Sequence, residues 1–156
     1  MNKIVISGYY GFANAGDEAM LTSIVRALRG VQPEIDITVI SGNPAETSAK
    51  HKVKSIYRFN FFKIYSALKN ADMLLSGGGS LLQDVPSLRS LFYYLFIILM
   101  GKIAGKKVML YSHGIGPIRN TLARKLTRIV CSKADLITVR DADSQTELLK
   151  MGLSGR

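Results

Sequence analysis

Short apolar runs alternate with helical patterns along this chain, and the alternation limits the folds that it can adopt. The runs are continuous and are bounded by Gly, Ser, Lys or Asp, which is typical of strands buried on both faces of a parallel sheet. They cover residues 4–7, 35–41, 53–57, 73–76, 108–112 and 136–139. Repeated strand–helix units of this kind predict an α/β fold, with a Rossmann-like parallel sheet and helices on both faces.

Helical patterns lie in most of the intervals between these runs. Apolar residues recur at helical spacing from Met20 to Leu28, and Gly30 ends that helix. Further helices are expected over 61–68, 122–130 and 141–151. The chain has 156 residues, the length of one ordinary domain, so we expect a single Rossmann-like domain over residues 1–156.

The segment 91–100 is hydrophobic on every side. It is far shorter than the ~20 residues that a membrane span requires, so a buried helix is the simpler interpretation. The alternative is a helix or loop that touches the bilayer interface, because Lys102, Lys106 and Lys107 follow it and would attract anionic headgroups.

The chain is strongly basic, with a net charge of +10 from 21 Lys and Arg against 11 Asp and Glu. The excess gathers in two intervals without any acid, 47–71 and 85–134. An anionic membrane surface or a phosphorylated substrate is therefore an expected partner. Only the charge would support nucleic acid, since no binding motif accompanies it, and we expect none. With Cys131 as the only cysteine, we expect no zinc site and a reducing, cytoplasmic compartment.

The first strand leads into a glycine-punctuated loop with the sequence GYYGFANAGDE. It is not a dinucleotide fingerprint, because Gly8 and Gly11 are three apart, and it lacks the Gly-Lys-Ser/Thr of a Walker loop. Its acidic pair, Asp17 and Glu18, would repel a phosphate at the start of the following helix. Asp17 is then either the helix cap or a carboxylate that binds sugar hydroxyls or accepts a proton. Gly11 and Gly16 are either turn residues or, with Asn14 between them, mark backbone that a ligand approaches closely.

The second glycine-rich stretch follows the fourth strand. Gly77, Gly78 and Gly79 precede Ser80 and a helical pattern, so we expect a loop whose free N–H groups bind an anion at a helix start. A tight turn is the alternative. Two polar residues later in the stretch, Gln83 and Asp84, would contact hydroxyls.

The third and fourth stretches follow the last two strands. His113, Gly114 and Gly116 come after the fifth strand, at a position where open α/β sheets bind ligands, although a lone histidine is more often structural. Arg140 follows the sixth strand and would hold a carboxylate or phosphate, or pair with a neighbouring aspartate. Because parallel strands end at one edge of a sheet, we expect all four stretches on the same rim.

These four stretches together resemble the polysaccharide pyruvyl transferase family. The matching motifs are, in order, GYYGFANAGDE at 8–18, SGGGSLLQD at 76–84, GIGPI at 114–118, and VRD at 139–141 with Ser144. Their order and spacing fit over essentially the whole chain. The pattern is most similar to that of the bacterial members that act in secondary cell wall polymer synthesis, the CsaB type.

The resemblance implies an enzyme that transfers an enolpyruvyl group from phosphoenolpyruvate to a sugar, forming a pyruvate ketal and releasing phosphate. The implied acceptor is a cell-surface polysaccharide or its lipid-linked precursor at the inner face of the membrane. Phosphoenolpyruvate is the donor substrate, and neither a separate cofactor nor a metal is implied. The implied fold is the N-terminal domain of a GT-B fold, so a second domain would complete the site, and this half alone would be inactive.

On this interpretation, Asp17 and His113 are the catalytic candidates. Substrate contacts are expected at twelve other positions: Gly11, Asn14, Gly16, Gly77, Gly78, Gly79, Ser80, Gln83, Asp84, Gly114, Gly116 and Arg140. Two other classes of function stay open from the residues alone. One is a GT-B-like glycosyltransferase that uses a nucleotide sugar, and the other is a basic binding module for a membrane surface.

Overall fold

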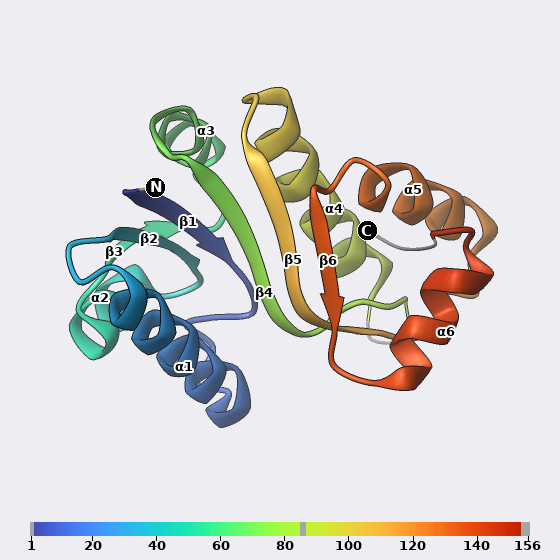
Figure 1. Cartoon of the computed structure of the whole chain (residues 1–156), viewed down its shortest axis with the longest axis horizontal. Coiled ribbons are helices and arrows are strands. Elements are labelled where there is room, and N and C mark those ends of the chain that lie inside the picture. Colours follow the sequence, from blue (N-terminus) through green and yellow to red (C-terminus); the bar gives the residue numbers. More distant parts are fainter. Residues whose placement is uncertain (1, 85–86, 154–156) are drawn as a thin grey trace.

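In the computed structural model, which describes residues 2–84 and 87–153, six strands form one parallel sheet. Their order is β3-β2-β1-β4-β5-β6, the order of a Rossmann fold (Figure 1). The strands are β1 (Lys3–Ser7), β2 (Asp36–Ser41), β3 (Lys54–Tyr57), β4 (Met73–Leu82), β5 (Lys107–Ile115) and β6 (Leu136–Val139). The prediction of a Rossmann-like parallel sheet is confirmed.

Helices follow the strands and cover both faces of the sheet. In the described part of the chain they are α1 (Ala15–Val31), α2 (Pro44–His51), α3 (Phe61–Asn70), α4 (Leu88–Ile103), α5 (Thr121–Cys131) and α6 (Ala142–Lys150). One apolar cluster joins α1 to β1, with Leu21 and Ile24 packed among Ile4 and Ile6. The other cluster joins α3, α4 and α5 to the opposite face, on which Val5 lies.

The sequence patterns did not predict α2, because its sequence PAETSAKH has no apolar stripe. Its start is encoded by capping instead: Asn43 accepts a hydrogen bond from the backbone N–H of Glu46, and Pro44 occupies the first turn. The helix buries two polar residues, Thr47 and His51. Thr47 Oγ1 lies 2.7 Å from Ser41 Oγ at the end of β2. A helix that packs through polar side chains shows no periodic pattern of apolar residues in its sequence.

The glycine run after residue 76 continues β4 rather than forming a loop. Gly77 pairs with Tyr111 and Gly79 with His113, so β4 and β5 stay hydrogen-bonded well beyond the predicted ends of both strands. The register of the ladder shifts between Gly79 and Leu82, directly after two glycines with positive φ, Gly78 (54°) and Gly79 (79°). Helix α4 starts only at Leu88. The prediction that a helix starts beside Gly77 to Ser80 is therefore wrong, and contacts from these four residues to a substrate stay predictions.

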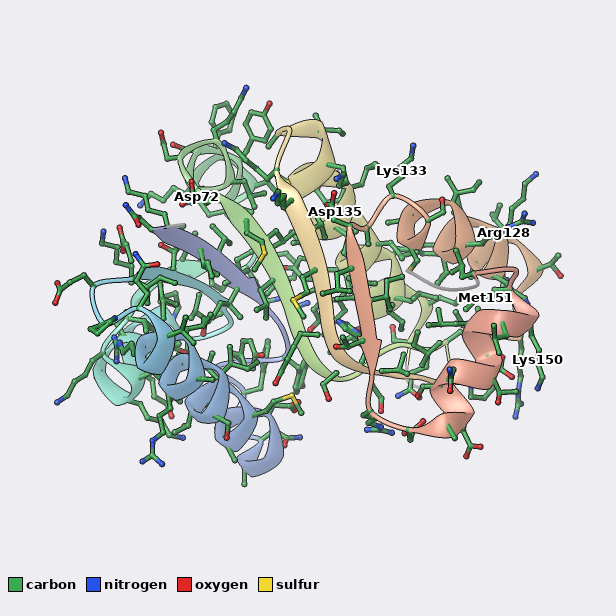
Figure 2. The ribbon with its side chains drawn as sticks, viewed as in Figure 1. Asp72, Arg128, Lys133, Asp135, Lys150 and Met151 are labelled. Carbon is green, nitrogen blue, oxygen red and sulfur yellow. The ribbon has the colours of Figure 1, made fainter. Side chains whose placement is uncertain are left out.

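Two aspartates directly precede strands, Asp72 before β4 and Asp135 before β6. Their carboxylates bind backbone N–H groups at the edge of the sheet where the strands begin. Asp72 Oδ2 accepts hydrogen bonds from the N–H groups of Asn2 (2.7 Å) and Lys3 (3.0 Å). Asp135 Oδ2 accepts from the N–H of Val108 (2.7 Å) and from Lys102 Nζ (2.8 Å). Figure 2 shows both aspartates at the edge from which the strands start. These carboxylates are structural, and they lie away from the rim that the sequence singles out.

Helix α4 buries one broad face in the core, and most of segment 91–100 lies on it, as the simpler interpretation of that segment predicts. Leu91, Tyr94, Leu95 and Ile98 all lie in the apolar core, and Phe92 and Phe96 form an exposed stripe. Lys102, which the bilayer alternative placed at the membrane, is bound by Asp135 instead. Within the described residues, no helix combines the length and the apolar character needed to cross a bilayer.

Candidate functional site

The four stretches singled out in the sequence follow four neighbouring strands, β1, β4, β5 and β6. The strand order reverses between β1 and β4, since β2 lies on the other side of β1, and such a switch point is where Rossmann-like sheets bind ligands. Tyr10 fastens the opening loop to β4, because its buried hydroxyl donates to the carbonyl of Gly77 at 3.0 Å. The predicted gathering of the four stretches on one rim is confirmed.

Asn14, rather than Asp17, caps α1. Asn14 Oδ1 accepts hydrogen bonds from the N–H groups of Gly16 (3.0 Å) and Asp17 (3.3 Å). The interpretation of Asp17 as the cap is therefore wrong. The side-chain oxygen of Asn14 is used to cap the helix. The carboxylate of Asp17 makes no capping hydrogen bond and is available to a ligand.

Of the acidic pair, Glu18 is buried and Asp17 is partly buried. Glu18 turns inward: its carboxylate accepts from Gly11 N–H at 2.9 Å, lies 2.8 Å from His51 Nε2, and lies 3.4 Å from Lys50 Nζ. Burial alone would raise the pKa of Glu18, but the Gly11 N–H, His51 and Lys50 outweigh it and hold that pKa below its ordinary value. Glu18 thus fixes the glycine loop against α2, a role that its position in the sequence did not reveal.

Asp17 lies against the end of β4. A Cβ atom on Gly79 would stand 3.0 Å from Asp17 Oδ1, so the absence of a side chain there leaves the carboxylate room. Partial burial, and next the charge of Glu18, raise the pKa of Asp17 above its ordinary value. A carboxylate whose charge is disfavoured is a better proton acceptor than a fully solvated one, which is the property that general base catalysis needs.

Arg140 lies against the same end of the sheet from the other side. A Cβ atom on Gly114 would stand 2.6 Å from Arg140 Cζ and 2.9 Å from Ser80 Oγ, so the glycine lets the guanidinium pack onto β5 beside Ser80. Arg140 Nε donates to Asp141 Oδ2 at 2.8 Å, which realises the predicted pairing with a neighbouring aspartate. Within the described residues its terminal nitrogens have no hydrogen-bond partner. They are free to bind an anion.

Gln83 and Asp84, which follow Ser80, contact the segment that comes after β5. Asp84 Oδ2 accepts from the N–H groups of Arg119 (2.6 Å) and Asn120 (2.8 Å), which holds the segment that follows β5. Gln83 occupies the space that a side chain on Gly116 would fill, since a Cβ atom there would stand 2.6 Å from Gln83 Oε1. Contacts from Gln83 and Asp84 to a substrate stay predictions.

His113 lies beneath the rim and is completely buried. Its Nε2 lies 3.0 Å from the carbonyl oxygen of Ser76 and 3.1 Å from Ser76 Oγ. Burial lowers the pKa of His113 from the usual 6.5 to about 4, so the ring is neutral at neutral pH and Nε2–H donates to the carbonyl. Its Nδ1 has no partner among the described residues. The catalytic role of His113 stays a prediction, and its burial favours positioning of β4.

The neutral state of His113 makes stability depend on pH. The unfolded chain takes up a proton near pH 6.5 and the folded chain only near pH 4, so acidification across this window favours unfolding, by about 3 kcal/mol for this group. Urea titrations at a series of pH values measure the loss. A His113→Gln variant lacks this group, so its stability should fall less steeply across the window; an identical slope would contradict the assignment.

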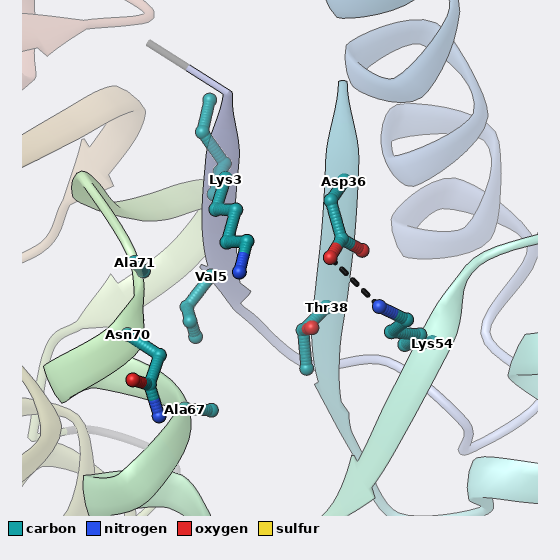
Figure 3. Close-up of a pocket in the computed structure, with 9 residues that line it drawn as sticks. Lys3, Val5, Asp36, Thr38, Lys54, Ala67, Asn70 and Ala71 are labelled. Atoms are coloured by element: carbon teal, nitrogen blue, oxygen red, sulfur yellow. Dashed lines mark hydrogen bonds and ion pairs between the residues drawn. The ribbon is translucent and has the colours of Figure 1, made fainter. Parts of the chain in front are cut away.

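Two hollows in the described structure lie elsewhere. One, of about 180 Å³, lies at the amino ends of β1 to β3, and Figure 3 shows Lys3, Asp36 and Lys54 around it. The other, of about 330 Å³, lies between α1 and α2 and is lined by Arg26 and Lys52 among others. Neither touches the rim. Residues 2–84 and 87–153 also contain no group of three His, Cys, Asp or Glu side chains with the spacing of a metal site.

Comparison with known protein families gives a match over most of the chain. The family model described as polysaccharide pyruvyl transferase matches residues 14–155. The match starts at the cap of α1 and includes Asp17, the glycine run of β4, the end of β5 and Arg140. No curated protein matches the chain.

Proposed function

Because the chain belongs to the polysaccharide pyruvyl transferase family, we propose that its rim binds the reactants of a transfer from phosphoenolpyruvate to a sugar. Membership supports transferase activity with a polysaccharide acceptor. The donor, the lipid-linked form of the acceptor and a role in cell wall synthesis are the finer parts of the proposal. They draw on the resemblance of the four rim motifs and on the net charge of +10, which suits anionic reactants.

The proposed reaction joins two sugar hydroxyls to C2 of the enolpyruvyl group. Each hydroxyl oxygen forms a bond to C2, the bond from C2 to the phosphate oxygen breaks, and phosphate leaves with its electron pair. One hydroxyl proton ends on the methylene carbon, which becomes a methyl group, and the other leaves with phosphate. A base for the hydroxyls and a cation for the donor's anionic groups are therefore required.

One observation carries the proposal: Asp17 and Arg140 flank adjacent residues of β4. The Asp17 carboxylate lies against Gly79, and the Arg140 guanidinium and Ser80 Oγ both lie against Gly114. A proton acceptor and an anion-binding cation thus face the same strand ends. We assign Asp17 to the acceptor hydroxyl and Arg140 to the carboxylate or phosphate of the donor. His113 supports this pair through its contact with Ser76.

We further propose that a second Rossmann-like domain faces this rim across a cleft, in the GT-B manner, and supplies the remaining donor contacts. The cytoplasmic face of the membrane is the proposed place of action, because a lipid-linked acceptor would be presented there. All experiments on activity therefore use the intact protein that contains this chain.

Arg140→Ala tests the assignment of the donor contact. Loss of one charge-assisted contact costs about 1.5–3 kcal/mol, so we expect KM for phosphoenolpyruvate to rise about 10- to 100-fold, while the KM for the acceptor changes little. Steady-state phosphate release at varied donor concentration gives both constants. Arg26→Ala is the matched control, since Arg26 is exposed on α1, away from the rim.

Two results would count against this function. An unchanged KM for phosphoenolpyruvate in Arg140→Ala would remove Arg140 from the donor site. Thermal stabilisation of the intact protein by nucleotide sugars, with none by phosphoenolpyruvate, would favour a glycosyltransferase instead.

A further inference from the structure

Helix α3 presents aromatic side chains to solvent. Its ten residues bury only Ile64 and Leu68 against the sheet. Phe62 is 92% exposed, and Phe61 and Tyr65 are exposed as well. These three rings give α3 an exposed apolar area that takes no part in its packing onto the sheet.

Neighbouring segments extend this apolar area. Phe96 of α4 contacts Phe61 edge-on, with ring centroids 5.4 Å apart, and Phe59 lies 6.4 Å from Phe61. Tyr57, at the end of β3, lies 5.8 Å from Phe59. We call the exposed rings of these segments the α3–α4 aromatic surface; its members are Tyr57, Phe59, Phe61, Phe62, Tyr65 and Phe96.

The charged residues of the segments that carry this surface are all positive. Both helices lie in the acid-free intervals 47–71 and 85–134, so neither α3 nor α4 contains a carboxylate. Lys63 and Lys69 on α3 and Arg89 on α4 are exposed. Lys69 Nζ lies 6.0 Å from the centre of the Tyr65 ring, so cations and rings share one face. Aromatic rings interleaved with lysines are complementary to an anionic lipid interface, where the rings enter the headgroup region and the lysines meet phosphates.

We propose that the α3–α4 aromatic surface docks the protein onto an anionic bilayer. The surface adjoins the rim: the Arg58 guanidinium lies 4.9 Å from the Phe59 ring centre and 5.1 Å from that of Phe12 in the opening loop. A sugar tethered to a lipid in the same bilayer would thereby be held near Asp17. This purpose rests on the proposed lipid-linked acceptor, whereas the docking itself is measured without any transfer reaction.

Partition of the intact protein onto vesicles tests the surface. Vesicles of phosphatidylcholine with equimolar phosphatidylglycerol are compared with vesicles of phosphatidylcholine alone, by sedimentation. We expect binding to the anionic vesicles that weakens with added salt. Phe62→Ser removes the most exposed ring, and Lys63→Glu reverses a charge beside it; each should weaken the partition about tenfold.

Matched controls lie on α1, on the opposite face of the sheet. Val31→Ser removes an apolar side chain that is 90% exposed, and Arg26→Glu reverses an exposed cation; neither should change the partition. Equal binding by all four variants, or no binding to anionic vesicles, would overturn the proposal. So would a dimer that Phe62→Ser dissociates in sedimentation velocity without vesicle binding, since the surface would then join two copies. Because the assay contains no donor or acceptor, its failure is distinct from a failure of the transfer reaction.

Discussion

Asp17→Asn is expected to lower the rate of pyruvyl transfer by about 10²–10⁴-fold and to leave the fold intact. Asn14 caps α1, so the substitution removes no helix cap, and an amide fills the space of the carboxylate without accepting a proton. Because partial burial and then Glu18 raise the pKa of Asp17, its ionised form disfavours folding, and the variant should be no less stable than the parent at neutral pH. Single-turnover phosphate release and thermal unfolding measure the two effects.

Two controls make this result specific. Asp143→Asn removes an exposed carboxylate from the first turn of α6 and should leave the rate unchanged. Asn14→Ala removes the real cap and should cost about 1 kcal/mol of stability. If Asp17→Asn kept the parental rate, Asp17 would have no part in proton transfer.

Gly78→Ala is expected to destabilise the protein by about 4 kcal/mol. Gly78 has a φ of 54°, which strains an alanine, and its new Cβ atom would overlap the sulfur of Met20 on α1. Either the Met20 side chain or the extended end of β4 would have to move to relieve the overlap. Urea unfolding followed by circular dichroism gives the change in the free energy of unfolding.

The chain offers a control that separates strain from crowding. Gly105 has a φ of 75°, and a Cβ atom there would meet nothing within 4 Å, so Gly105→Ala should cost only about 1 kcal/mol. Adding Met20→Ala to Gly78→Ala should restore part of the loss by removing the overlap. Equal effects of the two glycine substitutions would show that contact with Met20 is unimportant.

The fold was predictable from the sequence because its strands are apolar and continuous. Buried parallel strands such as β1 need apolar side chains on both faces, and alternation with helices leaves few topologies. The shared rim followed from the same logic, since loops after parallel strands meet at one edge. Helix α2 could not be predicted from these patterns. It is held by the polar residues Asn43 and Thr47, and its sequence has no periodic apolar residues.

Details of the site depended on contacts between distant segments. The sequence shows Asp17 and Glu18 as equals, but only the structure shows that His51, from α2, draws Glu18 inward. Three consecutive glycines predict a loop on local grounds. Their pairing with β5, through Gly79 and His113, is a long-range contact that overrides this preference.

If this rim serves pyruvyl transfer, release of phosphate from phosphoenolpyruvate depends on an acceptor saccharide, and an assay of that release is decisive. The intact protein is incubated with the donor and a panel of lipid-linked or aryl saccharides, and products are checked for the pyruvate ketal by mass spectrometry. We predict phosphate release only when a suitable saccharide is present, with one ketal formed for each phosphate. Phosphate release that no saccharide stimulates, or no release with any member of the panel, would contradict the claim.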